Sequence, residues 1–118
     1  KYPVDAPVQA NGGTTPLMYC CAAGQPHCLQ EILARGPDFT QRDSAGRTAL
    51  HYACKGGKLE NLQMLLNSMP KEAFIFTKEA RTVGGATALM YAVQSGNIQL
   101  VGECLNRGFN PYAKDDLG

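Results

Sequence analysis

Two histidines and five cysteines are the residues of this 118-residue chain that could do acid–base, metal or thiol chemistry. His51 could act as a general base or a metal ligand. His27 precedes Cys28 and Cys20 precedes Cys21, which could suggest a metal or thiol site. However, the chain has no Cys-x-x-Cys pair, and no Ser/His/Asp or paired-carboxylate arrangement can be traced. We therefore expect no enzyme, no cofactor and no metal site.

Two glycine-rich stretches, at residues 12–15 and 56–58, resemble fragments of phosphate-binding loops, but neither has the full P-loop or dinucleotide pattern. Charged residues make up 18% of the chain and the net charge is +1. Nucleic-acid binding normally needs a clustered basic face, so we expect no nucleic-acid partner. No apolar run approaches the roughly 20 residues of a membrane-spanning helix, so we expect no membrane insertion.

A phrase that occurs three times explains most of these residues. It reads TPLMYCCAAG at residues 15–24, TALHYACKGG at 48–57 and TALMYAVQSG at 87–96. The preceding glycines, Gly13, Gly46 and Gly85, are 33 and 39 residues apart. His51 and the cysteines thus stand in columns of an internal repeat, and the cysteine columns hold apolar or small residues. Core packing is the simpler explanation for all of them.

Each unit has the pattern of a helix, a tight turn, a second helix and an extended finger. The leading Gly suits a turn, and Thr two residues later can N-cap a helix of about eight or nine residues. The glycine that ends each phrase suits a helix C-terminus. Apolar spacing predicts second helices at residues 26–34, 59–67 and 98–106. One unit cannot bury its apolar side alone, whereas a stack of units can.

The period near 33 and the phrases TPLMYC, TALHYA and TALMYA resemble the ankyrin-repeat family and its T-P-L-H-x-A motif. This resemblance covers roughly residues 10–118. It implies an all-α fold, an ankyrin-repeat solenoid of stacked helix-turn-helix units with extended finger loops. The expected repeats span residues 10–42, 43–81 and 82–114, and a further repeat begins at 115–118.

The sequence departs from the family motif in two ways. Met18 and Met90 replace the motif His, which only His51 keeps, so the hydrogen bonds that this His makes are in question in repeats one and three. Repeat two is six residues longer than repeat one, because 19 residues separate Leu66 from Gly85 while 13 separate Leu33 from Gly46. We expect Pro70 to end the second helix and the six extra residues to loop out within 70–83.

The chain reads as an excised segment of a longer protein. Its last residues, DDLG, match DSAG at 43–46, where the previous finger turns. We expect the C-terminal face to be uncapped, with Leu100, Cys104 and Leu105 uncovered and available for self-association. The odd number of cysteines favours reduced thiols and an intracellular location, in the cytoplasm or the nucleus. We expect all five thiols to react slowly in the folded protein.

The resemblance implies a protein–protein interaction module that binds a partner protein or peptide through its fingers and the concave face of its first helices. Transferred column by column, this gives ten candidate residues: Arg42, Ser44, Ala45, Arg47, Tyr52, Lys55, Tyr91, Gln94, Ser95 and Lys114. The basic residues among them are compatible with an acidic or phosphorylated peptide, or simply with a solvated charged face. The tyrosine column, which includes Tyr19, could instead be partly buried in the stack.

The insertion adds Phe74 and Phe76 to the candidates. We expect at least one of them to be exposed and to contribute to a partner surface, while one or two of Phe74, Ile75 and Phe76 pack beneath the loop. Two other functions stay open: a non-catalytic targeting or autoregulatory segment of a larger enzyme or channel, and a structural spacer in a long solenoid.

Overall fold

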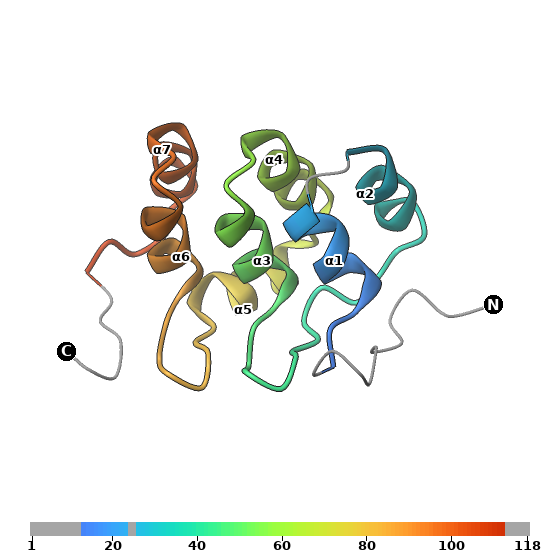
Figure 1. The fold of residues 1–118 in the computed structure, drawn as a ribbon, viewed down its shortest axis with the longest axis horizontal. Helices are drawn as coiled ribbons and strands as arrows, with labels where there is room; N and C mark the ends of the chain where they lie inside the picture. The colour runs from blue at the N-terminus through green and yellow to red at the C-terminus, as the bar shows by residue number, and fades with distance from the viewer. Residues whose placement is uncertain (1–12, 24–25, 113–118) are drawn as a thin grey trace.

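The computed structural model describes residues 13–23 and 26–112 of the chain, in which seven helices form two layers (Figure 1). The first layer holds the first helix of each repeat: α1 (Pro16–Ala23), α3 (Ala49–Gly56) and α6 (Ala88–Ser95). The second layer holds α2 (Pro26–Leu33), α4 (Leu59–Ser68) and α7 (Ile98–Asn106). These six helices confirm the predicted all-α stack of helix pairs. The seventh helix, α5 (Lys71–Glu79), follows α4.

The helix ends follow the repeated phrase. The Thr15 hydroxyl accepts a hydrogen bond from the Met18 amide at 3.3 Å, and the Thr87 hydroxyl accepts one from the Met90 amide at 3.4 Å. These bonds satisfy amides that have no partner inside the helix. At the other end, α3 and α6 stop at Gly57 and Gly96, which take the left-handed conformation that glycine adopts without strain. The equivalent Gly24 lies outside the described residues.

Small residues let the first helices approach closely. Ala53, Cys54 and Ala92 are fully buried between α1, α3 and α6. A Cβ atom on Gly56 would lie 3.1 Å from the carbonyl oxygens of Cys21 and Ala22, so the end of α3 contacts α1 with no room for a side chain. Leucines fill the space between the two layers: Leu17, Leu29, Leu50, Leu62, Leu65 and Leu100.

The fingers are two neighbouring hairpins, which we call finger A (residues 41–47) and finger B (residues 80–86). They project from the same end of the first layer (Figure 1). The Val83 amide of finger B donates to the Ala45 carbonyl of finger A at 2.8 Å, and the Arg42 guanidinium donates to the Arg81 carbonyl at 2.8 Å. The extra residues of repeat two therefore leave the spatial relation between the fingers intact.

The predicted loop at residues 70–83 is wrong in its first part, which forms α5. Pro70 ends α4 as expected, but a new helix begins directly after it. The reason is helical spacing: Ala73, Phe74 and Thr77 share one side of the segment, and that side packs on the core. The Phe74 ring lies 6.0 Å from the Phe109 ring, and the Thr77 hydroxyl contacts the Met69 sulfur at 3.3 Å.

The expectation of an uncovered α7 is also wrong for two of its three residues. Leu100 and Cys104 are fully buried, and only Leu105 is exposed, at 43%. Leu100 and Cys104 lie on the inner side of α7, which faces the rest of its own stack. The Cys104 sulfur is 3.9 Å from the Cys54 sulfur on α3. These side chains are covered by preceding helices and need no following repeat.

Candidate functional site

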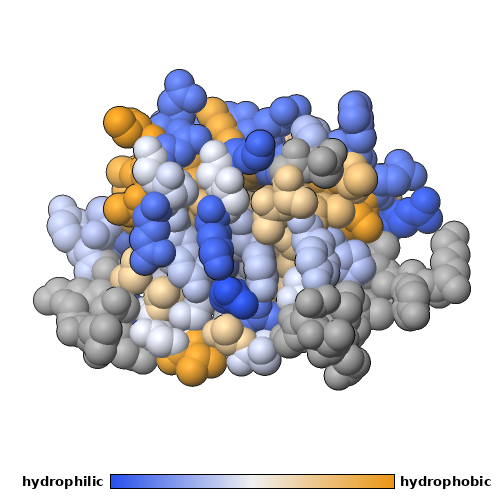
Figure 2. Space-filling model, viewed as in Figure 1, coloured by the Kyte–Doolittle hydropathy of each residue, from blue (hydrophilic) through white to orange (hydrophobic). Residues whose placement is uncertain are grey.

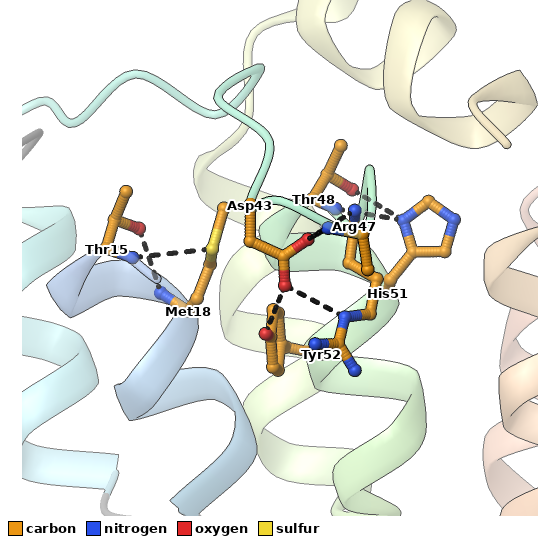
Figure 3. A network of polar contacts seen from close by, with 8 residues as sticks. Thr15, Met18, Asp43, Arg47, Thr48, His51 and Tyr52 are labelled. Carbon is orange, nitrogen blue, oxygen red and sulfur yellow. Dashed lines mark hydrogen bonds and ion pairs between the residues drawn. The ribbon is translucent and has the colours of Figure 1, made fainter. Parts of the chain in front are cut away.

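A buried carboxylate fixes finger A to the first helix that follows it (Figure 3). Asp43 Oδ1 accepts the Ala45 and Arg47 amides at 3.0 and 2.8 Å. Its Oδ2 accepts Arg47 Nε at 2.8 Å and the Tyr52 hydroxyl at 2.5 Å. Burial alone raises the pKa of Asp43, but the hydrogen bonds from Tyr52 and Arg47 outweigh it and hold the pKa below its ordinary value. Four hydrogen bonds thus hold finger A in one shape.

This arrangement changes the expected role of Arg47. Its guanidinium pairs with Asp43 and lies 5.0 Å from the centre of the Tyr52 ring. Burial lowers the pKa of Arg47, but the hydrogen bond to Asp43 more than compensates and raises the pKa above its ordinary value. Arg47 is therefore charged, half-buried and already paired. It adds little positive charge to the surface.

The motif position that holds His or Met has one shared task, visible for Met18 and His51 in Figure 3. The Thr48 amide donates to His51 Nδ1 at 3.1 Å, and the Thr48 hydroxyl lies 3.0 Å from the same nitrogen. In repeats one and three a methionine sulfur replaces that nitrogen: the Thr15 amide contacts Met18 Sδ at 3.4 Å and the Thr87 amide contacts Met90 Sδ at 3.5 Å. The thioether thus keeps this local contact.

His51 also makes a contact that methionine cannot make. Its Nε2 lies 3.3 Å from the Ala86 carbonyl in finger B, and since Nδ1 accepts from Thr48, Nε2 is the nitrogen that donates. The ring is fully buried, and burial lowers its pKa to about 4. His51 is therefore a neutral structural bridge between repeat two and finger B, and it has no access to a substrate.

The three tyrosines of the repeat column have different surroundings. Tyr19 is exposed, at 44%. Tyr52 is half-buried under Arg47 and bonded to Asp43, and Tyr91 is half-buried with its ring edge-on to His51 at 5.5 Å. Partial burial therefore describes two of the three positions. Tyr19 is the tyrosine with most surface available to a partner.

The exposed residues of α1, α3 and α6 form one continuous side of the molecule, which we call the first-helix face: Tyr19, Ala22, Ala23, Lys55, Val93, Gln94 and Ser95. Figure 2 shows this side as mostly blue and pale, with the deepest orange at the upper edge and over the fingers. The repeat columns placed all of these residues except Val93 among exposed candidates. Val93 was missed because its column holds small residues in the other repeats.

The finger candidates are divided in the structure. Arg42 and Ser44 are exposed on finger A, and Ala45 is half-buried where finger B bonds to it. Lys114 and the expected start of a further repeat lie outside the described residues. Among the described candidates, Arg42 is the one that brings an exposed positive charge to the fingers.

The insertion places its two phenylalanines on different sides. Phe74 is half-buried against Phe109, whereas Phe76 is 45% exposed. The expectation that one aromatic is exposed while another packs beneath the segment agrees with this placement. Two exposed apolar neighbours were not candidates: Ile75, at 51%, and Val83, at 75%.

The cysteines do not all belong to the core. Cys21, Cys54 and Cys104 are fully buried, Cys20 is half-buried and Cys28 is exposed. Burial raises the pKa of the Cys20 and Cys21 thiols, and the hydrogen bond with Cys104 raises that of Cys54. The expectation of five slow thiols is thus contradicted at Cys28, which lies on the outer side of α2 where its repeat column no longer faces the core.

Within the described residues, no three His, Cys, Asp or Glu side chains are grouped closely enough to hold a metal ion. In the same part of the chain, no helix has the length and apolar character needed to cross a membrane. The surface that remains is therefore one of exposed helix faces and finger tips.

The comparisons with known proteins agree with this architecture. A family model described as ankyrin repeats (3 copies) matches residues 2–75 and 17–115. The chain is 39% identical over 93 residues to the photoreceptor ankyrin repeat protein of Homo sapiens, covering 76% of this chain and 20% of that protein. It is 31% identical over 101 residues to the protein fem-1 homolog A-like of Mus musculus, covering 86% and 14%.

A shorter match, 41% identical over 54 residues, relates the chain to inversin of Gallus gallus, covering 46% of this chain and 5% of that protein. The chain thus spans a fifth or less of the length of these relatives, and none of their three names denotes an enzyme. Ankyrin repeats are generally protein–protein interaction modules. The three-copy match, the paired helices and the finger hairpins together show that the chain belongs to the ankyrin-repeat family.

Proposed function

We propose that this segment is a non-catalytic module that binds another protein through the first-helix face and the adjacent tip of finger A. One observation carries the proposal: Asp43 locks finger A onto α3, so exposed Arg42 and Ser44 are held in a fixed position beside that face. A surface that is ordered before binding loses little conformational freedom in the complex. Tyr19 supplies an exposed aromatic ring of the type that often anchors interfaces.

The chemistry of the face suggests a polar partner segment. Arg42 and Lys55 are exposed and positive, while Arg47 is compensated by Asp43. Gln94 and Ser95 add uncharged hydrogen-bonding groups. A peptide with carboxylates and neutral polar side chains complements this set better than a basic one.

The test is a selection of displayed peptides on the folded chain, followed by affinity measurements with variants. Tyr19→Ala combined with Lys55→Ala should weaken the selected peptides by about tenfold or more, since both side chains are exposed and neither supports the core. The matched control is Glu31→Ala with Gln99→Ala, two exposed positions of the second layer. Equal loss in both variants, or loss in the control alone, would reject the first-helix face.

We also propose an intracellular location, in the cytoplasm or the nucleus. The support is the set of five free thiols, one of which, Cys28, is exposed. An exposed thiol persists in a reducing compartment and is readily oxidised elsewhere. Imaging of the full-length protein with a fluorescent tag checks this proposal, and a secreted product would overturn it.

A further inference from the structure

The outer side of α5 carries an apolar pair that the fold does not use. Ala73, Phe74 and Thr77 pack toward the core, so the stripe on the opposite side consists of Glu72, Ile75, Phe76 and Glu79. Ile75 and Phe76 are 51% and 45% exposed at the middle of that stripe. Polar residues would serve folding equally well there, and adjoining exposed apolar side chains are typical of interaction sites.

This apolar pair forms one wall of a shallow depression of about 560 Å³ between α5 and the fingers. We call its lining the α5 patch: Arg42, Ile75, Phe76, Glu79, Ala80 and Arg81. The volume is within the range of sites that accept one or two side chains of a ligand. The patch is made from both fingers and α5, and it shares no residue with the first-helix face.

Arg42 gives the α5 patch its charge preference. Its guanidinium carbon lies 5.2 Å from the centre of the Phe76 ring, and one Nη donates to the Arg81 carbonyl at 2.8 Å. No carboxylate among the described residues forms an ion pair with Arg42. A guanidinium has five N–H donors in a planar fork, so Arg42 can still bind a carboxylate beside the apolar wall. Arg81 and Glu79 leave the lining with a net positive charge.

We propose that the α5 patch is a second docking surface, for a short amphipathic segment of a partner protein that presents an apolar side chain next to a carboxylate. The apolar side chain covers Ile75 and Phe76, and the carboxylate pairs with Arg42. A basic segment would meet Arg42 and Arg81 with like charge and is disfavoured. This proposal goes beyond the first-helix face and does not depend on it.

The test is an NMR titration of the ¹⁵N-labelled chain with two synthetic peptides of equal length. One alternates leucine pairs with glutamate, and the other has lysine in place of every glutamate. The acidic peptide should shift the amide signals of Arg42, Ile75 and Phe76 in a saturable way, and the basic peptide should bind about tenfold more weakly or not at all. Raising the salt concentration should weaken the acidic peptide.

Variants separate the parts of the patch. Phe76→Ala and Arg42→Glu should each weaken the acidic peptide by about tenfold or more, while Tyr19→Ala on the first-helix face leaves it unchanged. Phe76 and Arg42 are exposed, and circular dichroism verifies that both variants stay folded. Equal binding of both peptides, shifts confined to α1, α3 and α6, or no shift at millimolar peptide would overturn the proposal. Concentration-dependent shifts of the same amides without peptide would assign the patch to a second copy of the chain.

Discussion

At the level of single residues, His51 is the titratable group whose burial has the clearest thermodynamic consequence. Its pKa is about 4 in the folded chain and near 6.5 when unfolded. Between these values the unfolded chain takes up a proton that the folded chain refuses. Stability is therefore fully present above pH 6.5 and is lost as the pH falls toward 4.

We expect the free energy of unfolding to fall by up to about 3 kcal/mol between pH 6.5 and pH 4 through His51. His51→Met is the matched control, because Met18 and Met90 stand at the same motif position and keep the threonine contact. This variant loses the bond to Ala86 but should also lose the pH dependence. Urea unfolding at several pH values measures both. The same slope in the two proteins would contradict the role given to His51.

Asp43 provides a second test at this level. Asp43→Asn should lower the free energy of unfolding by about 2–3 kcal/mol, because Arg47 and Tyr52 lose a buried carboxylate partner. Asp38→Asn is the control, since Asp38 is an exposed residue near finger A and its exchange should cost well under about 1 kcal/mol. Chemical unfolding of both variants supplies the comparison, and equal costs would refute a special role for Asp43.

Neither role was evident from sequence. Asp43 acquires its partners from Arg47 and Tyr52, four and nine residues away, and only the folded finger brings the three together. The substitution of Met for His looked like a lost hydrogen bond. The motif alone gives no sign that a thioether sulfur reaches the same amide.

At the level of elements, the repeated phrase predicted six helices within one or two residues of their observed ends. It succeeded because threonine, leucine and glycine recur at fixed spacing, so each unit supports the assignment of the others. The same comparison failed at α5, which has no counterpart in repeats one and three. There the Phe-Ile-Phe run was read as extended, although Ala73, Phe74 and Thr77 have the spacing of a helix side.

The two phenylalanines of α5 form a matched pair of variants. Phe74→Ala should lower the free energy of unfolding by about 1–3 kcal/mol, because its ring packs against Phe109 and the core. Phe76→Ala, two residues later on the exposed side, should change it by less than about 0.5 kcal/mol. Thermal or chemical unfolding of both proteins checks the difference. A larger loss for Phe76 would mean that α5 packs by its other side.

At the scale of the whole molecule, the thiols report how the stack opens. Cys28 should react with a thiol reagent within the folded protein, and Cys20 more slowly. Cys21, Cys54 and Cys104 should react only when the layers separate, since all three are fully buried between helices. Mass spectrometry of peptides labelled in the native and in the denatured state distinguishes the two groups. Early labelling of Cys54 would show that α3 and α7 separate locally.

The spacing of the fingers has a use in protein engineering. Fingers A and B remain bonded through Val83 and Ala45 although their glycines are 39 residues apart, against 33 in the preceding unit. Chain added between buried Met69 and buried Ala80 is therefore absorbed without disturbing the stack. This segment is a graft site. A fluorescent reporter or a foreign binding loop spliced beside exposed Pro70 would be displayed next to the fingers, on a scaffold whose geometry is set elsewhere.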